Sequence, residues 1–559
     1  MNEVKKAYLD IMEAALSAYS REHIEEYFNR CGKDGVTEHG FPRLTSDIGI
    51  LIANGRQSEL KELFPQMMEL CIREVQKPPT ATTGNNFSVL ELIGCITELR
   101  AAGTVDEARL DRWCEALGTL DPYRAYTAIA LKPEDRPNNW AIFAAVSEQM
   151  KTAIGYTPDE EFIELQLSTQ VIHLDENGMY RDPNEPMVYD AVSRGLFCLL
   201  IKHGYRGKYL EVIDSALRRA GLMTVDMQSA TGELPFGGRS NGFLHNEGWI
   251  AAICEYEAAR YAEMGDELSA MEFKSAALRA RRVAERWLSH EPIRHIKNYY
   301  PTSSGYGCEE YAYFDKYMIT CASVFYIAYT LCDPELEERI YPQGNVATVT
   351  SEHFHKLFLR AGGYSLELEL NANRHYDSSG IGKLQREGAN GEVCISIPSS
   401  SEAVFKTGVG ACDNISLCPG TLLDGEPIYL SDGSFPITVK ERFADADSAS
   451  ATLEIKLGGL EMEWKLRLSE QGLTSELKGE RKLLMLLPYL HYDGEEESEI
   501  AVERNALTVK HRGSVCRYTS SGKITETDRR GSSRCGILGA YSTIAYFSLR
   551  VGVEIFNEE

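Results

Sequence analysis

The chain has 559 residues, 43% apolar and 25% charged, a composition typical of globular proteins and a length that favours two or more domains. Its formal net charge of −25 argues against nucleic acid or an anionic membrane surface as a partner, because both require clustered Lys and Arg. The net charge does not argue against a small anionic substrate, because the charges close to a binding site decide whether such a substrate binds.

The N-terminal segment MNEVKKAYLDIMEAALSAY is charged and amphipathic from its first turn, without the apolar core and cleavage site of a signal peptide. No run of 18 uncharged apolar residues occurs, so no transmembrane span is predicted. The 14 cysteines are scattered singly and form no CxxC pair, which favours buried, reduced thiols. The sequence therefore predicts a cytoplasmic protein.

Apolar residues recur at helical spacing up to about residue 331, and the predicted helices alternate between two kinds. Amphipathic, charged helices are predicted at residues 2–29, 57–76, 105–118, 158–174, 208–221 and 265–288. Helices almost without charge are predicted at residues 46–54, 87–99, 139–150, 190–203, 248–258 and 317–331. Because helices that are apolar all round are buried, the alternation predicts an (α/α)6 toroid over residues 1–335. An open helical solenoid is the alternative.

After a linker predicted at residues 336–350, the pattern changes to short segments in which apolar and polar residues alternate. Two examples are ATLEIKLGGLEMEWKLRLSE and STIAYFSLRVGVEIF, and Gly, Asn, Asp and Ser separate such segments. This pattern is typical of antiparallel strands joined by tight turns. The sequence predicts an all-β antiparallel sandwich domain over residues 351–559.

Polar and aromatic residues gather in the segments that precede the uncharged helices. These segments are residues 37–47, 80–88, 134–140, 176–190, 232–249 and 299–316. In a ring of helical hairpins they all lie on one rim, where the positive ends of six helix dipoles face the same space. The segments at the opposite ends of the helices, such as residues 53–57 and 202–208, are short and plain. A ligand cleft is therefore predicted at the first rim.

The candidate site residues on this rim divide by chemistry. The aromatic faces of Trp140, Trp249, Tyr306, Tyr311 and Tyr313 suit sugar rings; Arg43, Arg181, Arg194, Arg239 and Lys316 suit a carboxylate; and Asp190, Glu247, Glu309, Glu310 and Asp315 are acid–base groups. Glycoside hydrolysis needs two carboxyl groups. We predict Asp190 and Glu310 for these roles, followed by Glu309, Glu247 and His245. A helix cap, an ion pair or simple packing is the alternative for each residue.

No cofactor is predicted. The sequence HFH at residues 353–355 lacks a third ligand at metal-binding spacing, so no metal site is predicted either. Phosphate-binding glycine loops are missing from the sequence, and no GxSxG nucleophile elbow is predicted.

Four segments resemble bacterial carbohydrate-active proteins in which an (α/α)6 toroid precedes a β-sandwich. They are NNWAIF (138–143), GMYRDPNEPMVYD (178–190), PFGGRSNG (235–242) and GYGCEEYAYFDKYM (305–318). The chain looks most similar to the exo-acting β-glucuronidases of gut polysaccharide degraders, and heparinase II/III-like and alginate-type lyases share the layout. The segment HYDSSGIGKLQRE (375–387) resembles the first sandwich strands of these families.

The resemblance implies one of two reactions on a uronate-containing oligosaccharide. A lyase of this class would neutralise the uronate carboxylate with Asn and Arg and would remove the C5 proton with Tyr or His. Asn138 or Asn139, Tyr189, His245 and Tyr306 are available for these roles. The abundance of Asp and Glu on the rim instead favours a hydrolase that removes β-glucuronic acid. A non-catalytic sugar-binding protein is the third alternative, and homo-oligomers occur among proteins of this layout.

Overall fold

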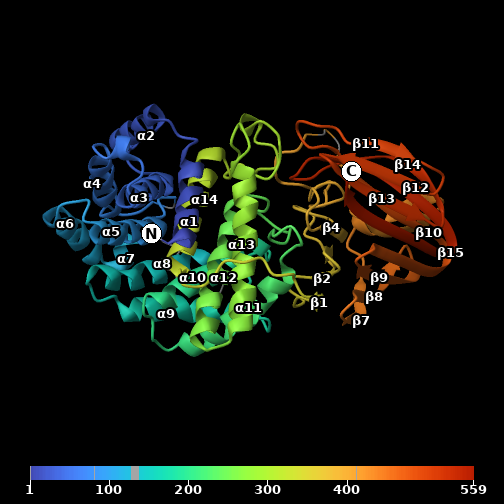
Figure 1. Cartoon of the computed structure of the whole chain (residues 1–559), viewed down its shortest axis with the longest axis horizontal. Coiled ribbons are helices and arrows are strands. Elements are labelled where there is room, and N and C mark those ends of the chain that lie inside the picture. The colour runs from blue at the N-terminus through green and yellow to red at the C-terminus, as the bar shows by residue number, and fades with distance from the viewer. Residues whose placement is uncertain (1, 81, 127–137, 409, 411, 559) are drawn as a thin grey trace.

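The structure is a computed structural model that describes residues 2–80, 82–126, 138–408, 410 and 412–558. Helices occupy the chain up to residue 331, and strands follow from residue 346 (Figure 1). The predicted order, a helical region followed by an antiparallel β region, is confirmed. Residues 81 and 134–137 of the predicted rim segments lie outside the described residues. No helix in the described ranges has the length and apolar character needed to cross a membrane.

Within the described residues, six helices contact one another in a closed series. They are α3 (Gly40–Ala53), α5 (Asn85–Ala102), α8 (Asn139–Gln149), α10 (Met187–Lys202), α12 (His245–Glu263) and α14 (Phe314–Leu331). Each packs against the next, and α14 packs against α3, which an open solenoid would not allow. These ring helices are buried around most of their circumference, because their sequences offer almost no polar face to water.

A second layer of amphipathic helices covers the ring. It consists of α1 (Glu3–Leu16) on α14, α4 (Phe64–Val75) on α3, α6 (Glu107–Gly118) on α5, α9 (Glu160–Gln170) on α8, α11 (Leu210–Met227) on α10 and α13 (Glu267–Leu288) on α12. The remaining helices are α2 (Arg21–Asp34) and the short α7 (Pro122–Ala125). The prediction of one helix over residues 2–29 is wrong. Ser20 begins α2 as its N-cap by accepting a hydrogen bond from the His23 N–H.

Four strands form a small antiparallel sheet that lies next to the helices (Figure 1). In order they are β1 (Val346–Val349), β2 (Lys356–Ala361), β3 (Tyr364–Glu369) and β4 (Gly380–Arg386). Strand β1 falls inside the segment predicted as a linker, because residues 346–349 pair with β2.

The later strands build a larger antiparallel sheet. They are β5 (Cys418–Leu423), β6 (Glu426–Tyr429), β7 (Ile437–Ala444), β8 (Ser448–Leu457), β9 (Leu460–Ser469), β10 (Gly472–Tyr492), β11 (Glu499–Val502), β12 (Ala506–His511), β13 (Ser514–Ser520), β14 (Lys523–Ser532) and β15 (Ile537–Asn557). Leu366 of the small sheet and Trp464 of the large sheet belong to one buried apolar cluster. The two sheets therefore share a core.

The small sheet supports the chain segment that leads into α12. The Phe236 N–H donates to Glu367 Oε2 (3.1 Å), and Lys383 Nζ donates to the Leu234 carbonyl oxygen (2.9 Å). Both strand residues are buried beneath the segment. The β region thus fixes one of the six segments at the rim of the helix ring.

Candidate active site

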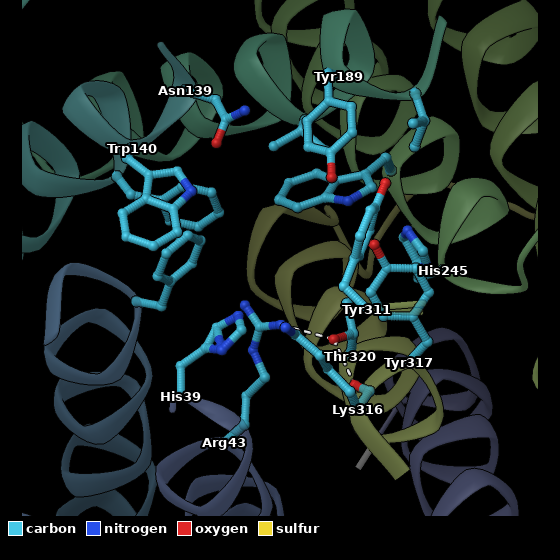
Figure 2. A pocket seen from close by; sticks show the side chains of 15 residues that line it. His39, Arg43, Asn139, Trp140, Tyr189, His245, Tyr311, Lys316, Tyr317 and Thr320 are labelled. Atoms are coloured by element: carbon cyan, nitrogen blue, oxygen red, sulfur yellow. Dashed lines mark hydrogen bonds between the residues drawn. The ribbon is translucent and has the colours of Figure 1, made fainter. Parts of the chain in front are cut away.

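A cavity of about 270 Å³ lies at the N-terminal ends of the ring helices (Figure 2). Its described lining consists of His39, Arg43, Phe87, Asn139, Trp140, Phe143, Val188, Tyr189, Val192, His245, Trp249, Tyr311, Lys316, Tyr317 and Thr320. All of these except Tyr311 belong to the N-cap or the first two turns of a ring helix. The cavity is therefore built by helix ends and receives the positive ends of their dipoles.

Most lining residues come in pairs one helical turn apart. The pairs are His39 with Arg43, Asn139 with Phe143, Val188 with Val192, His245 with Trp249, and Lys316 with Thr320. Residues i and i+4 lie above one another on the same face of a helix. Each ring helix except α5 therefore presents two successive turns to the cavity.

Cations occupy one wall of the cavity, opposite Asn139 and Tyr189 (Figure 2). Arg43 is buried; its Nε donates to Glu91 Oε1 (2.5 Å) and its Nη1 donates to Thr320 Oγ1 (2.7 Å). Burial lowers the pKa of Lys316, and the nearby charge of Arg43 lowers it further. The described lining contains no Asp or Glu. Two cations that face one space repel each other, so an anionic ligand would be stabilised between them.

The two histidines of the lining are held neutral. Burial, together with the charge of Arg43, lowers the pKa of His245 to about 3. Burial also lowers the pKa of His39 well below its ordinary value, assisted by Arg43 and Lys316. Nε2 of His245 lies 3.3 Å from Asn246 Nδ2, and Nδ1 is buried without a hydrogen-bond partner among the described residues. At neutral pH the histidines add polarity to the cavity but no charge.

Three tyrosine hydroxyls meet at one serine on the wall of the cavity. Ser240 Oγ lies 2.8 Å from the hydroxyl oxygen of Tyr317, 3.0 Å from that of Tyr311 and 3.2 Å from that of Tyr189. Burial raises the pKa values of Tyr311 and Tyr317. The guanidinium of Arg239 lies 4.3 Å from the centre of the Tyr189 ring. Among these three tyrosines, Tyr189 is therefore the one whose ring face is contacted by a cation, Arg239.

Eight residues from the sequence prediction come together in this cavity. They are Arg43, Asn139, Trp140, Tyr189, His245, Trp249, Tyr311 and Lys316. Trp140 packs edge-on against Phe87 with their ring centroids 5.1 Å apart. Arg239 lies one layer behind the wall, where it pairs with the buried Asp182, and Asp182 in turn accepts a hydrogen bond from Asn139 Nδ2 (3.0 Å).

The predicted acid–base pair, Asp190 and Glu310, is not brought together. Asp190 is buried and accepts hydrogen bonds from Arg194 Nη2 (2.6 Å) and from the Tyr180 N–H (2.8 Å). It follows Tyr189 directly, and one residue rotates a helix by about 100°, so Asp190 points away from the cavity. Glu310 is exposed and lines a second cavity of about 520 Å³ between the segment before α14 and residues 403–406.

The other predicted residues have structural partners elsewhere. Among the carboxylates, Glu247 pairs with Lys297 (2.7 Å), Glu309 pairs with Arg534 (2.6 Å), and Asp315 lies 3.6 Å from His23 Nε2. Among the arginines, Arg194 pairs with Asp190, and Arg181 lies 3.2 Å from His353 Nε2. Asn138 caps α8, and the Tyr306 hydroxyl lies 2.7 Å from Ser532 Oγ. Most of these groups are buried, and a buried charge requires a partner. These partners are brought together by tertiary packing, so they could not be identified from the sequence.

Some lining residues escaped the sequence prediction. His39 and Thr320 each lie one helical turn from a predicted residue, so the four-residue spacing was a usable signal. Phe87, Phe143 and Tyr317 look like ordinary core residues in the sequence. Ser240 lies outside the lining but contacts its tyrosines. Its place in the string GRSNG (238–242) was a local signal, whereas its contacts with three tyrosines from distant segments left none.

No protein-family model matches the chain, and no curated protein matches it significantly. Among solved structures, a heparinase III aligns at 10% identity and TM-score 0.47, covering 92% of this chain and 76% of its own. The chondroitin AC lyase of Streptomyces coelicolor A3 aligns at 11% identity and TM-score 0.44, covering 99% and 80%. A GH127 β-arabinofuranosidase aligns at 9% identity and TM-score 0.34, covering 98% and 80%. Likeness at this level identifies neither a family nor a reaction.

Proposed function

We propose that the chain is an enzyme that cleaves a uronate-containing oligosaccharide, and that it does so by β-elimination. The observation that carries this proposal is the lining of the 270 Å³ cavity: two cations, neutral histidines, several tyrosines and tryptophans, and no carboxylate among its described residues. In this proposal the ring helices and their outer partners form an (α/α)6 toroid over residues 1–335, and residues 351–559 form a separate sandwich domain.

Binding of the acidic sugar follows from the charges and shapes of the walls. Arg43, Lys316 and the helix N-termini attract a carboxylate, and Trp140 and Trp249 offer apolar faces for the C–H side of a sugar ring. Ligand cavities usually measure about 300–1,000 Å³. A cavity of about 270 Å³ therefore suits one sugar residue better than a long stretch of polymer.

The same cations would activate the substrate. A uronate C5–H becomes removable when the neighbouring carboxylate is neutralised, because the negative charge left at C5 then spreads into that group. Arg43 is buried and Lys316 is half-buried, and electrostatic interactions are stronger away from bulk water, so these cations would supply this stabilisation. They would therefore act on the transition state as well as on binding.

Tyr189 is the base in this proposal. As phenolate it takes the C5 proton, the C5–H electron pair forms the C4=C5 double bond, and the C4–O bond breaks with its electrons on the leaving oxygen. The protonated tyrosine then returns the proton to that oxygen, so the step balances. The Arg239 guanidinium lies 4.3 Å from the centre of the Tyr189 ring, while the raised pKa values of Tyr311 and Tyr317 keep them as hydroxyls.

Hydrolysis, with removal of β-glucuronic acid, is the second candidate function. One observation favours it: two protonatable carboxyl groups lie directly behind the cavity wall. Burial raises the pKa of Asp182, which bonds to Asn139, and burial raises the pKa of Glu91 beside Arg43 to about 7. A general acid needs such a raised pKa. Both side chains, however, are held by an arginine and lie outside the lining.

Product analysis separates the two reactions. Uronate oligosaccharides would be incubated with the protein, and the products identified by mass and ultraviolet absorbance. Elimination gives products that sum to the substrate mass, one of which carries an absorbing unsaturated uronate, and it should disappear in Tyr189→Phe. Products that together gain one water would establish hydrolysis instead, and an unchanged substrate panel would contradict both proposals.

A further inference from the structure

Ser240 occupies an unusual place between the cavity and the β region. It is buried and has a φ of +58°, a left-handed conformation that residues other than glycine rarely adopt. Its Oγ lies within hydrogen-bonding distance of three tyrosine hydroxyls, those of Tyr189, Tyr311 and Tyr317. A strained residue with so many polar partners suggests that its position serves the site.

The proton count of a serine hydroxyl restricts how these four groups can bond. A hydroxyl donates one proton and accepts through two lone pairs. Three tyrosines around it can therefore all be satisfied when two donate to Oγ and the third accepts from it. A phenolate at Tyr189 can only accept, so in that state Tyr311 and Tyr317 are the two donors to Oγ. The serine proton is then left for the Tyr189 oxygen.

The β region holds Ser240 in this conformation through a buried ion pair. The Ser240 N–H donates to Glu309 Oε1 (2.8 Å), and Arg534, between β14 and β15, donates to both Glu309 oxygens at 2.6 and 3.0 Å. Burial alone would raise the pKa of Glu309, but Arg534 and the backbone N–H groups lower it below its ordinary value. Glu309 is thus a fixed acceptor, and Arg534 also donates to the Gly307 carbonyl oxygen (2.6 Å).

We propose that Ser240 is a positioning residue whose hydroxyl donates to the Tyr189 oxygen and stabilises its phenolate. In this proposal Glu309, which is bound by Arg534 of the β region, holds Ser240 in place. This inference rests on the proposed role of Tyr189 as base. Two donated hydrogen bonds polarise the serine hydroxyl and strengthen the bond that it donates. The charged and titratable groups around Tyr189 are Arg239, Glu309, Tyr311, Tyr317, Tyr376 and His245.

Ser240→Gly tests the inference without disturbing the backbone, because glycine adopts positive φ freely. The variant removes the acceptor of the Tyr311 and Tyr317 hydroxyls, so a small fall in melting temperature is expected and is measured beside the rates. A hydrogen bond to a charged oxygen contributes about 10- to 100-fold. We expect kcat at neutral pH to fall by about that factor, with little change in KM. The rising limb of the pH–rate profile should move upward by about one to two pH units. A profile that keeps its midpoint and loses rate equally at every pH would overturn the inference.

A direct titration separates this inference from the proposed function. The ultraviolet difference spectrum between the wild type and Tyr189→Phe reports the phenolate of Tyr189, with or without any substrate. The same difference is recorded in the Ser240→Gly background. The phenolate should form at lower pH when Ser240 is present. Equal titration in both backgrounds would refute the inference even if elimination is established, and a lower midpoint would support it even if the reaction proves to be another.

Arg534→Met tests the contribution of the β region, with Arg360→Met as its matched control. Arg360 is also a buried arginine of the β region, and it donates to the carbonyl oxygens of Val225 (2.7 Å) and Gln228 (3.3 Å), away from the tyrosines. Arg534→Met should shift the phenolate titration in the same direction as Ser240→Gly, whereas Arg360→Met should lower thermal stability alone. If Arg534→Met does not fold, Glu309→Gln tests the same contact. Equal titrations in Glu309→Gln and the wild type would contradict the role given to the ion pair.

Discussion

The cavity at the helix ends and the contact surface between the helices and the β region use charge in opposite ways. The cavity presents Arg43 and Lys316 with no carboxylate in its described lining. Near the contact surface, buried carboxylates pair directly with lysines, as in Glu247 with Lys297 (2.7 Å) and Glu367 with Lys356 (2.9 Å). Segments of the same rim supply both regions. The cavity cations are paired as well, Arg43 with Glu91 (2.5 Å) and Lys316 with Glu38 (4.0 Å), but both carboxylates lie outside the described lining, so the cations are the charges that face a ligand.

This difference explains why a count of Asp and Glu along the rim predicts hydrolysis, whereas our proposal, which starts from the cavity lining, is elimination. A buried carboxylate is tolerated only when a cation and hydrogen bonds satisfy it, so most of the rim carboxylates are structural. The polar groups of the described cavity lining are tyrosines, histidines, one amide, one threonine and cations. Four variants test whether the groups of the cavity lining are functional and the paired carboxylates structural.

Tyr189→Phe should have the largest effect. Removing a catalytic base costs about 10²- to 10⁴-fold in rate. Since only one hydroxyl is lost, and it faces the cavity, thermal stability should stay near that of the wild type. The measurement is kcat on a uronate oligosaccharide beside a thermal melt. A variant with unchanged kcat would remove Tyr189 from the mechanism.

Asp190→Asn, one residue further along the chain, should affect stability first. Breaking a buried ion pair typically costs about 3–5 kcal/mol, because Arg194 would keep its charge without a partner. Urea unfolding measures the loss. The double variant Asp190→Asn with Arg194→Met should regain part of it. Stable Asp190→Asn protein without activity would instead restore the catalytic role predicted from the sequence.

Lys316→Met should weaken binding of the acidic sugar. A charge-assisted hydrogen bond contributes about 1.5–3 kcal/mol, so KM should rise by roughly 10- to 150-fold. In the wild type, affinity for the acidic sugar should fall as pH rises, because Lys316 loses its charge. Burial lowers the pKa of Lys316, so this loss of affinity should begin at a lower pH than it would with an exposed lysine. A matched neutral sugar provides the control. An equal loss of affinity for both sugars would exclude a carboxylate-binding role.

Glu310→Gln should have the smallest effect, less than about twofold in kcat. Glu310 is exposed and lines the second cavity, so a surface substitution there is expected to change stability by no more than about 0.5 kcal/mol. Initial rates and a thermal melt test both points. A severe loss of activity would return Glu310 to the catalytic centre and would favour hydrolysis.

Periodicity in the sequence predicted the helical region, the strands that follow and the rim that carries the site, because burial of helix and strand faces is a local pattern. The predicted starts of several ring helices, however, are late. Helix α10 begins at Met187 instead of residue 190, and α12 begins at His245 instead of residue 248. The first turns were read as loops because they are polar and aromatic. They are polar because they line the cavity.

The sequence by itself determined which segments are helices or strands and which end of the ring carries reactive side chains. Tertiary structure alone decided which of those side chains are free. Tyr189 and Asp190 are neighbours in sequence, yet helix rotation turns one toward the cavity and the other toward Arg194. Likewise, Glu309 is bound by Arg534, 225 residues away. Partners this distant leave no local pattern, because folding selects them by proximity and charge.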